Sequence, residues 1–499
     1  MTFLLMFALS VVLEATLPLI PKQRDELRYL MSAFAIGIIT ALSCYVLILD
    51  ISILSVLLGC VSLYRIVNIL RALKARMHPS YLKRVCLRTT VWLAGTQAEL
   101  YLLRHIWDYV APSPEILWTG VACLQLVIGT LVYLSVRKHR KHAAASIAVT
   151  ALSDKHLPSV TVAVAARNET DELLRCIESV LASDYPKLEV LVLDDCSQNR
   201  RTSEIIRSFA HRGVRFIPGG DVDDSWLARN HSYDTLAKAA SGAYILFCST
   251  SLELEPTSLR RMVSYAVNRQ KSMLSVLPRN DAPNIAGWFL ESMRTAWELM
   301  PPRRWLGRPP VASACWLIAA KSLRQAGGFA AARRMIVPEA YFAGRLIEGD
   351  QYSFIPGGGY LGVASREALE GQHARIVRIN YPSLHRKPES VALTAAALIG
   401  IGILPFAQVF SILAGRQWLL PAIISFATAL LLVASYHCVL VLSRQRVPKL
   451  ASLLFPATIL AALWLQHVSM YKYEFREVIW KERNVCVPVM HVTPHLPKI

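Results

Sequence analysis

The sequence predicts an α/β domain, with a mostly parallel sheet and flanking helices, inserted between an N-terminal and a C-terminal block of transmembrane helices. Of the 499 residues, 54% are hydrophobic, and the mean hydropathy of +0.37 is too high for a disordered or ordinary soluble chain. The apolar residues gather at the two ends and leave a polar middle. There, short β-branched runs alternate with helix-like stretches, which is typical of a parallel sheet with crossover helices.

The charge of the chain indicates contact with a membrane surface. Its 54 Lys and Arg residues exceed its 35 Asp and Glu residues, which gives a formal net charge of +19. Much of this excess lies beside apolar segments, where basic residues set topology and meet anionic lipid head groups. We therefore expect membrane lipids as partners and no nucleic acid. The ten cysteines form no C-x-x-C pair and accompany no histidine cluster, so neither a disulfide framework nor a zinc site is predicted.

Residues 1–142 are predicted to form the N-terminal block, with about five helices. The first apolar segment, 2–20, lacks the basic start and the small-residue cleavage site of a signal peptide, so it is interpreted as a retained span. Residues 29–70 are long enough for two helices joined by a tight turn. Two further apolar segments, 89–107 and 116–136, complete the block.

Basic loops predict the orientation of this block. Lys and Arg cluster within residues 22–28, 71–88 and 137–141, whereas the loops at Asp50 and 108–115 carry none. Because loops rich in Lys and Arg stay on the cytosolic side, the N-terminus is expected outside and the middle domain in the cytosol. The expected location is a membrane of the bacterial inner-membrane or plasma-membrane type.

Residues 386–470 are predicted to form the C-terminal block, with two or three helices within 391–414, 419–442 and 450–466. Residues 471–499 form a basic tail that we expect on the cytosolic face. Three full crossings would put this tail outside. The alternatives are therefore three crossings, or two crossings and one re-entrant segment.

The middle domain, residues 155–385, alternates predicted strands with predicted helices. The strands are 160–165, 188–193, 214–217 and 243–248, and the helices are 169–182, 201–210 and 229–240. In such sheets ligands bind outside the carboxyl ends of the strands, so polar residues that directly follow a strand are the candidates for a site.

These segments carry a resemblance to a known family. The stretches "VAARNETDE", "VLVLDDCSQN" and "WLARNHSYDTLAKAASGAYILF" resemble, in this order, the family 2 glycosyltransferases, whose nucleotide-sugar domain has the GT-A fold. The resemblance covers Pro158–Arg378. The apolar flanks also resemble those of membrane-embedded members, which act on lipid acceptors or build polysaccharide.

The resemblance implies a nucleotide-sugar site. Asp194 and Asp195 would accept hydrogen bonds from the uracil and the ribose, for which carboxylates are suited. The alternative for one of them is a helix-capping role. Arg167-Asn168-Glu169 would lie over the base, and Arg229 would contact the diphosphate.

The family's metal motif is replaced in this sequence. Members carry Asp-x-Asp after the strand that corresponds to 243–248, and these carboxylates hold Mg²⁺ or Mn²⁺. Here the aligned residues are Ser249-Thr250-Ser251, whose hydroxyls cannot replace two anionic oxygen ligands, so no metal ligand is assigned. A literal Asp-x-Asp occurs at Asp221-Val222-Asp223, where it is interpreted as a solvated loop in preference to a displaced metal site.

Two further motifs are altered or ambiguous. Pro338-Glu339 aligns with the acidic pair of the family, so Glu339 could deprotonate the acceptor hydroxyl. The alternative is an acid favoured at a helix N-terminus by the macrodipole. Gln372 and Arg375 resemble the Q-x-x-R-W motif and would bind diphosphate or acceptor, but Ile376 replaces the stacking Trp.

The sequence thus predicts a membrane-bound, inverting glycosyltransferase that transfers a sugar from a nucleotide-sugar donor, most simply a UDP-sugar, to a lipid or growing polysaccharide at the cytosolic membrane face. Inversion and the acceptor class rest on the resemblance alone. The alternative is a catalytically inactive glycosyltransferase-like subunit that serves as partner or scaffold for another membrane subunit.

Overall fold

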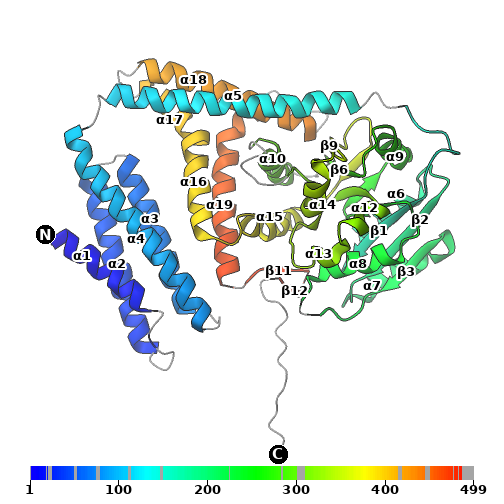
Figure 1. Cartoon of the computed structure of the whole chain (residues 1–499), viewed down its shortest axis with the longest axis horizontal. Coiled ribbons are helices and arrows are strands. Elements are labelled where there is room, and N and C mark those ends of the chain that lie inside the picture. Colours follow the sequence, from blue (N-terminus) through cyan, green and yellow to red (C-terminus); the bar gives the residue numbers. More distant parts are fainter. Residues whose placement is uncertain are drawn as a thin grey trace, which may run out of the picture.

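The computed structural model describes residues 2–17, 20, 25–49, 53–74, 79–110, 114–146, 150–223, 225–281, 285–300, 309–413, 419–443, 450–475, 477–481 and 483–485. Figure 1 shows an N-terminal helical bundle on one side, an α/β domain on the other, and further long helices between and above them.

The N-terminal helices are α1 (Thr2–Thr16), α2 (Asp25–Leu49), α3 (Ile53–Lys74), α4 (Pro79–Val110) and α5 (Pro114–Ser146). A buried polar network ties three of the first four together. Arg65 on α3 bonds Glu14 on α1 at 2.8 Å and Gln97 on α4 at 2.8 Å. Because each charge is paired inside an apolar bundle, loss of one partner would be costly, and the network fixes how these helices pack.

The C-terminal helices follow the predicted apolar segments. The helix α16 (Pro388–Ala397) continues through a π-helical turn, η4 (Leu398–Ile403), into α17 (Leu404–Leu413). The helix α18 (Leu419–Ser443) lies beside α5, and both run across the ends of α16 and α19 (Phe455–Glu474), which follows the short helix η5 (Ala451–Leu454) (Figure 1). Pro456 lies in the first turn of α19, where its missing N–H breaks no hydrogen bond, so α19 is continuous.

Five of the described helical segments are long and apolar enough to span a membrane. They are Glu26–Ile48, Glu115–Lys141, Pro388–Phe410, Leu419–Ser443 and Ala451–Glu474, with Leu5–Thr16 and Leu54–Leu70 as shorter apolar helices. The predicted segment 89–107 lies inside α4, which is long but does not reach this apolarity within the described residues.

The α/β domain contains a seven-stranded sheet in the order β3-β2-β1-β4-β8-β6-β9. The strands are β1 (Val160–Ala166), β2 (Leu188–Asp194), β3 (Val214–Pro218), β4 (Tyr244–Cys248), β6 (Met273–Leu277), β8 (Cys315–Ala319) and β9 (Tyr352–Pro356). β8 runs antiparallel to β4 and β6, and the other pairs are parallel. The mostly parallel sheet is therefore confirmed, and each of the four strands predicted above matches within one residue.

The same part of the chain contains helices and a smaller sheet. The helices are α6 (Asp171–Leu181), α7 (Arg200–Ser208), η3 (Ala210–Arg212), α8 (Ala228–Ala239), α9 (Ser258–Asn268), α10 (Ile285–Leu299), α12 (Ala320–Gln325), α13 (Gly328–Ala331), α14 (Pro338–Ile347) and α15 (Leu369–Ser383). Among these helices, α10 and α15 pack mainly against each other and against α18 and α19. The smaller sheet pairs β5 (Leu252–Leu254) and β7 (Arg279–Asn280) with β10 (Val363–Ser365).

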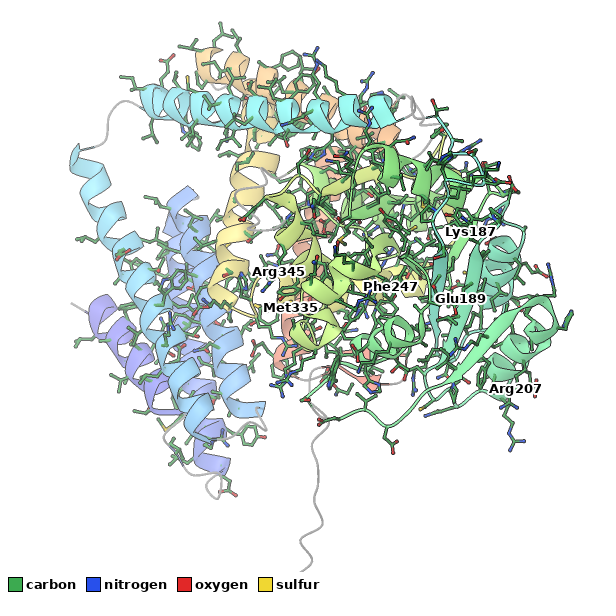
Figure 2. All side chains as sticks on the ribbon, turned by 45° about the vertical axis from the view of Figure 1, so that its right-hand side comes forward. Lys187, Glu189, Arg207, Phe247, Met335 and Arg345 are labelled. Atoms are coloured by element: carbon green, nitrogen blue, oxygen red, sulfur yellow. The ribbon has the colours of Figure 1, made fainter. Side chains whose placement is uncertain are left out.

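An aromatic cluster forms much of the core on one face of the large sheet. Phe247 on β4 stacks on Trp316 on β8 with ring centroids 4.3 Å apart, and Phe329 packs edge-on against Phe247. Figure 2 shows Phe247 inside the domain, whereas Arg207 extends away from its surface. Such burial of large rings fixes the strands rigidly, so the residues that follow them have defined positions.

Candidate functional site

A cavity of about 300 Å³ lies at the carboxyl ends of β1 and β4. Most of the residues predicted to bind the nucleotide sugar line it, together with one of the pair Gln372 and Arg375: Arg167, Glu169, Asp195, Arg229, Ser249, Ser251 and Arg375. These residues come from segments that follow β1, β2 and β4 and from α8 and α15. Four predicted residues, Asn168, Asp194, Gln372 and Glu339, do not line it.

Asp194 and Asp195 have different roles: Asp194 stabilises a loop, and Asp195 lines the cavity. The Asp194 carboxylate accepts a hydrogen bond from the Ser197 backbone N–H at 3.0 Å, so this residue holds the loop before α7. It does not cap that helix, because the N-cap of α7 is Asn199, whose side chain accepts from the Arg201 N–H. Asp195 is only 5% exposed and faces the cavity. The two point differently because successive residues at a strand end face opposite sides.

Arg167 and Asn168 organise the loops after β1 and β2. Arg167 Nη1 donates to the carbonyl oxygens of Asp195 at 2.6 Å and Cys196 at 2.8 Å, and its Nε donates to the carbonyl of Lys481 at 2.9 Å. Asn168 has a φ of 52°, and its side-chain oxygen accepts from the Gln198 N–H at 2.8 Å. The guanidinium is therefore largely occupied by backbone carbonyls.

The residues in place of the metal motif form hydroxyl contacts. The Ser249 and Ser251 hydroxyl oxygens lie 3.2 Å apart, and Thr250 donates to Glu169 Oε1 at 2.9 Å. Asp223 lies in an exposed loop and accepts from Ser225. Among the described residues no group of three His, Cys, Asp or Glu side chains is arranged to hold a metal ion. The hydroxyls of Ser249 and Ser251, with the Glu169 carboxylate already bonded to Thr250, do not fit Mg²⁺ or Mn²⁺.

The C-terminal tail enters the cavity. Its strands β11 (Ile479–Trp480) and β12 (Arg483–Asn484) form a hairpin, and Lys481 at its turn lines the cavity and forms an ion pair with Glu169. Burial lowers the pKa of Lys481 to about 8. No sequence signal marked this lysine, because its partners lie over 300 residues earlier: the hydrogen bond from Arg167 spans 314 positions.

Arg375 belongs to a charge network that reaches α10. It bonds Glu291 Oε2 at 2.7 Å and also pairs with Glu367, while Arg294 pairs with Glu291 from the same helix. Burial would raise the pKa of Glu291, but these two guanidinium groups outweigh it and hold the pKa at about 2. Gln372, one turn before, is buried and donates to the Glu367 carbonyl at 2.9 Å.

Arg378, which the sequence interpretation missed, lines the cavity one turn after Arg375 on α15. Burial, and then the nearby Arg229, lower its pKa to about 10. The spacing i, i+3 puts both arginines on one helix face, a signal that could have identified it.

Glu339 does not line the cavity. It is fully buried in the first turn of α14, and neither carboxylate oxygen has a hydrogen-bond partner among the described residues. Its negative charge acts to raise the pKa of Arg229 and of Arg378, which both line the cavity. Arg229 in turn donates to the Ser313 carbonyl at 3.0 Å. A buried carboxylate without a hydrogen bond is unusual and calls for a functional reason.

Known proteins resemble the central part of the chain. Residues 161–327 match the family described as Glycosyl transferase family 2. The succinoglycan biosynthesis protein ExoO of Rhizobium meliloti is 35% identical over 117 residues, which cover 22% of this chain and 30% of that protein. The glycosyltransferase AglE of Haloferax volcanii is 33% identical over 112 residues, covering 22% of this chain and 35% of that protein. The matches thus span about a third of these relatives.

Among solved structures, the mannosyltransferase PcManGT from Pyrobaculum calidifontis in complex with GDP-Man and Mn²⁺ superposes with a TM-score of 0.44 at 16% identity. The superposition covers 70% of this chain and 99% of that one. TarS of S. aureus in complex with UDP gives a TM-score of 0.32 at 12% identity, covering 51% of this chain and 72% of that one.

Proposed function

We propose that the protein is a membrane-bound glycosyltransferase, because residues 161–327 match the family described as Glycosyl transferase family 2 and contain most of a mainly parallel sheet with flanking helices. It would transfer a sugar from a nucleotide-sugar donor, most simply a UDP-sugar, to a lipid or growing glycan at the cytosolic membrane face. The main support for the proposal is that Glu169, Asp195 and Arg229, which come from three different segments, line the same cavity. The helices able to span a membrane support the membrane location.

The donor would bind with its nucleoside toward Asp195 and the loop at Arg167, and with its diphosphate toward the cationic side of the cavity. Arg229 and Arg378 supply the cations of that side. Lys481 lines the cavity near Arg167, to which its carbonyl is hydrogen-bonded. The residues at positions 249–251 do not fit a divalent metal, so no step is assigned to one. Fixed cations in a partly enclosed site can stabilise the charge that develops on the leaving diphosphate.

The transfer would proceed by inversion. The acceptor hydroxyl oxygen forms a bond to the anomeric carbon while the bond from that carbon to the diphosphate oxygen breaks, and the nucleoside diphosphate leaves with the electron pair. The hydroxyl proton would pass to Glu339, whose unpartnered carboxylate lies beside the arginines of the cavity wall. Gln372 would act indirectly, because its amide holds the Glu367 carbonyl.

A thermal-shift panel on the purified full-length protein tests this proposal. UDP-, GDP- and CDP-linked sugars are compared, each with Mn²⁺ and with EDTA, because a ligand that binds the folded state raises the midpoint of unfolding. We expect one nucleotide sugar to stabilise the protein equally in both arms. Stabilisation that requires Mn²⁺ would contradict the conclusion that residues 249–251 do not hold a divalent metal. No stabilisation by any nucleotide sugar at millimolar concentration would favour the inactive subunit.

A further inference from the structure

A second cavity, about 330 Å³ in volume, lies where the membrane helices meet α10. Its walls include one or more apolar residues from each surrounding helix: Val132, Trp297, Ala397, Ile401, Leu432 and Ile459. The two lining threonines offer no unused donor, because Thr394 donates to the Ser390 carbonyl and Thr458 to the Leu454 carbonyl. A glycan would leave its hydroxyls without partners here, so the cavity suits a hydrocarbon.

The π-helical turn of the α16–α17 segment forms part of the cavity wall. Leu398, Ile401 and Gly402 of η4 line it, and the Gly400 carbonyl accepts a hydrogen bond from the Gln125 side chain of α5 at 2.6 Å. A π-turn widens a helix locally and is often retained at functional sites. The Gln125 amide thus provides a hydrogen-bond donor for a carbonyl of the π-turn, which stabilises this wall of the cavity.

A small third cavity, the neck, shares lining residues with this cavity and with the proposed donor cavity. The neck has a volume of about 40 Å³, close to the roughly 30 Å³ share of one water molecule. It shares Met293, Trp297 and Ala462 with the apolar cavity and Ser313 with the donor cavity. A growing polysaccharide could not pass through so small a space, whereas the hydroxyl end of a lipid could occupy it.

The charges around the neck disfavour an anionic headgroup. Among the described residues, the one cation that lines the neck is Arg294, which is paired with Glu291. The neck is also lined by the carboxylate residue Glu298 and the neutral residues Asn380 and Gln466. Within the described lining of the neck, no cation other than the paired Arg294 would balance a phosphate there, whereas a neutral hydroxyl can bond to amides and carboxylates.

From these observations we propose that the apolar cavity binds the hydrocarbon tail of a lipid acceptor whose uncharged, hydroxyl-bearing headgroup lies in the neck. This inference rests on the proposed function and narrows its acceptor to a neutral lipid alcohol. The Ser313 segment, common to neck and donor cavity, would bring the lipid hydroxyl close to the sugar carbon that it attacks.

Photo-crosslinking of the full-length protein in phosphatidylcholine nanodiscs tests the inference. The probe is a diacylglycerol with a diazirine in one acyl chain, and phosphatidic acid with the same diazirine chain is the comparison. We expect diacylglycerol to label peptides from η4 and α19 at the cavity, at least fivefold more than phosphatidic acid does. Ala462→Phe, at the junction of neck and cavity, should reduce this labelling at least fivefold.

Ala457→Phe provides the matched control, because Ala457 is an exposed residue of the same helix. It should leave the labelling unchanged. If Ala462→Phe does not fold, Ala397→Phe fills the cavity from α16 instead. Equal labelling of the cavity variant and the control, or labelling by phosphatidic acid as strong as by diacylglycerol, would overturn the inference. A nucleotide-sugar thermal shift measured on the same samples reports separately on the proposed function.

Discussion

Glu339 combines complete burial with the absence of a hydrogen-bond partner among the described residues. If it accepts the acceptor proton, Glu339→Gln removes proton transfer while it preserves shape and the neighbouring arginines. We expect kcat to fall by about 10²- to 10⁴-fold, with the nucleotide-sugar thermal shift retained. Steady-state transfer rates together with that shift are the measurements. An unchanged kcat would show that Glu339 is an N-terminal helix acid only.

Lys481 provides a prediction about pH. Its pKa of about 8 lies below the usual value for lysine, so its charge is present at lower pH and is lost as pH rises through about 8. Nucleotide-sugar affinity should therefore fall between about pH 7 and pH 9. Lys481→Ala should weaken binding by about 10- to 100-fold at the lower pH, as expected for one charge-assisted contact.

Lys481→Arg is the matched variant, because a guanidinium remains charged throughout this range. Its affinity should depend less on pH than that of the unmodified protein. Titrations with the nucleotide sugar at each pH measure both effects. An alanine variant with unchanged affinity would mean that the hairpin turn only packs against the cavity.

At the scale of elements, close backbone contact between strand ends holds the site in shape. A Cβ added at Gly219, just after β3, would lie 2.5 Å from the Asp194 carbonyl and 3.0 Å from the Asp195 Cα. At Gly220 it would meet nothing within 4 Å. Gly219→Ala should therefore destabilise the protein by about 1–3 kcal/mol through overpacking, and it should weaken nucleotide binding by displacing Asp195.

Gly220→Ala is the control for this prediction and should change neither quantity. Thermal unfolding with and without nucleotide sugar compares the two variants. Equal midpoints for the two alanines would show that the loop after β3 moves freely to admit the extra carbon.

At the scale of the whole molecule, the predicted orientation of the chain has a direct test. Basic loops predict the N-terminus outside and the α/β domain in the cytosol. An epitope tag at the N-terminus should be removed by protease in right-side-out membrane vesicles. A tag inserted after Gln270, an exposed residue in the turn that follows α9, should be protected there. The reverse pattern of protection would invert the orientation.

The sequence by itself determined four strands of the large sheet, β1 to β4, and the helices between them, and it predicted a ligand site at the carboxyl ends of these strands. Hydropathy and the alternation of β-branched runs with helical stretches depend on nearby residues, so β1, β2, β3 and β4 could be placed within one residue. Parallel strands bring their carboxyl ends to one edge. From that rule Glu169, Asp195 and Ser249 are expected to lie close together, and all three line the same cavity.

Only the tertiary structure decided which predicted residues reach the cavity and what else lines it. Asp194 and Asp195 are equivalent in the sequence pattern, and loop hydrogen bonding separates them. Lys481 enters from a hairpin that no periodicity connects to β1. The apolar cavity likewise needs helices far apart in the chain. Contacts between distant segments leave no local pattern, because they depend on how whole elements pack.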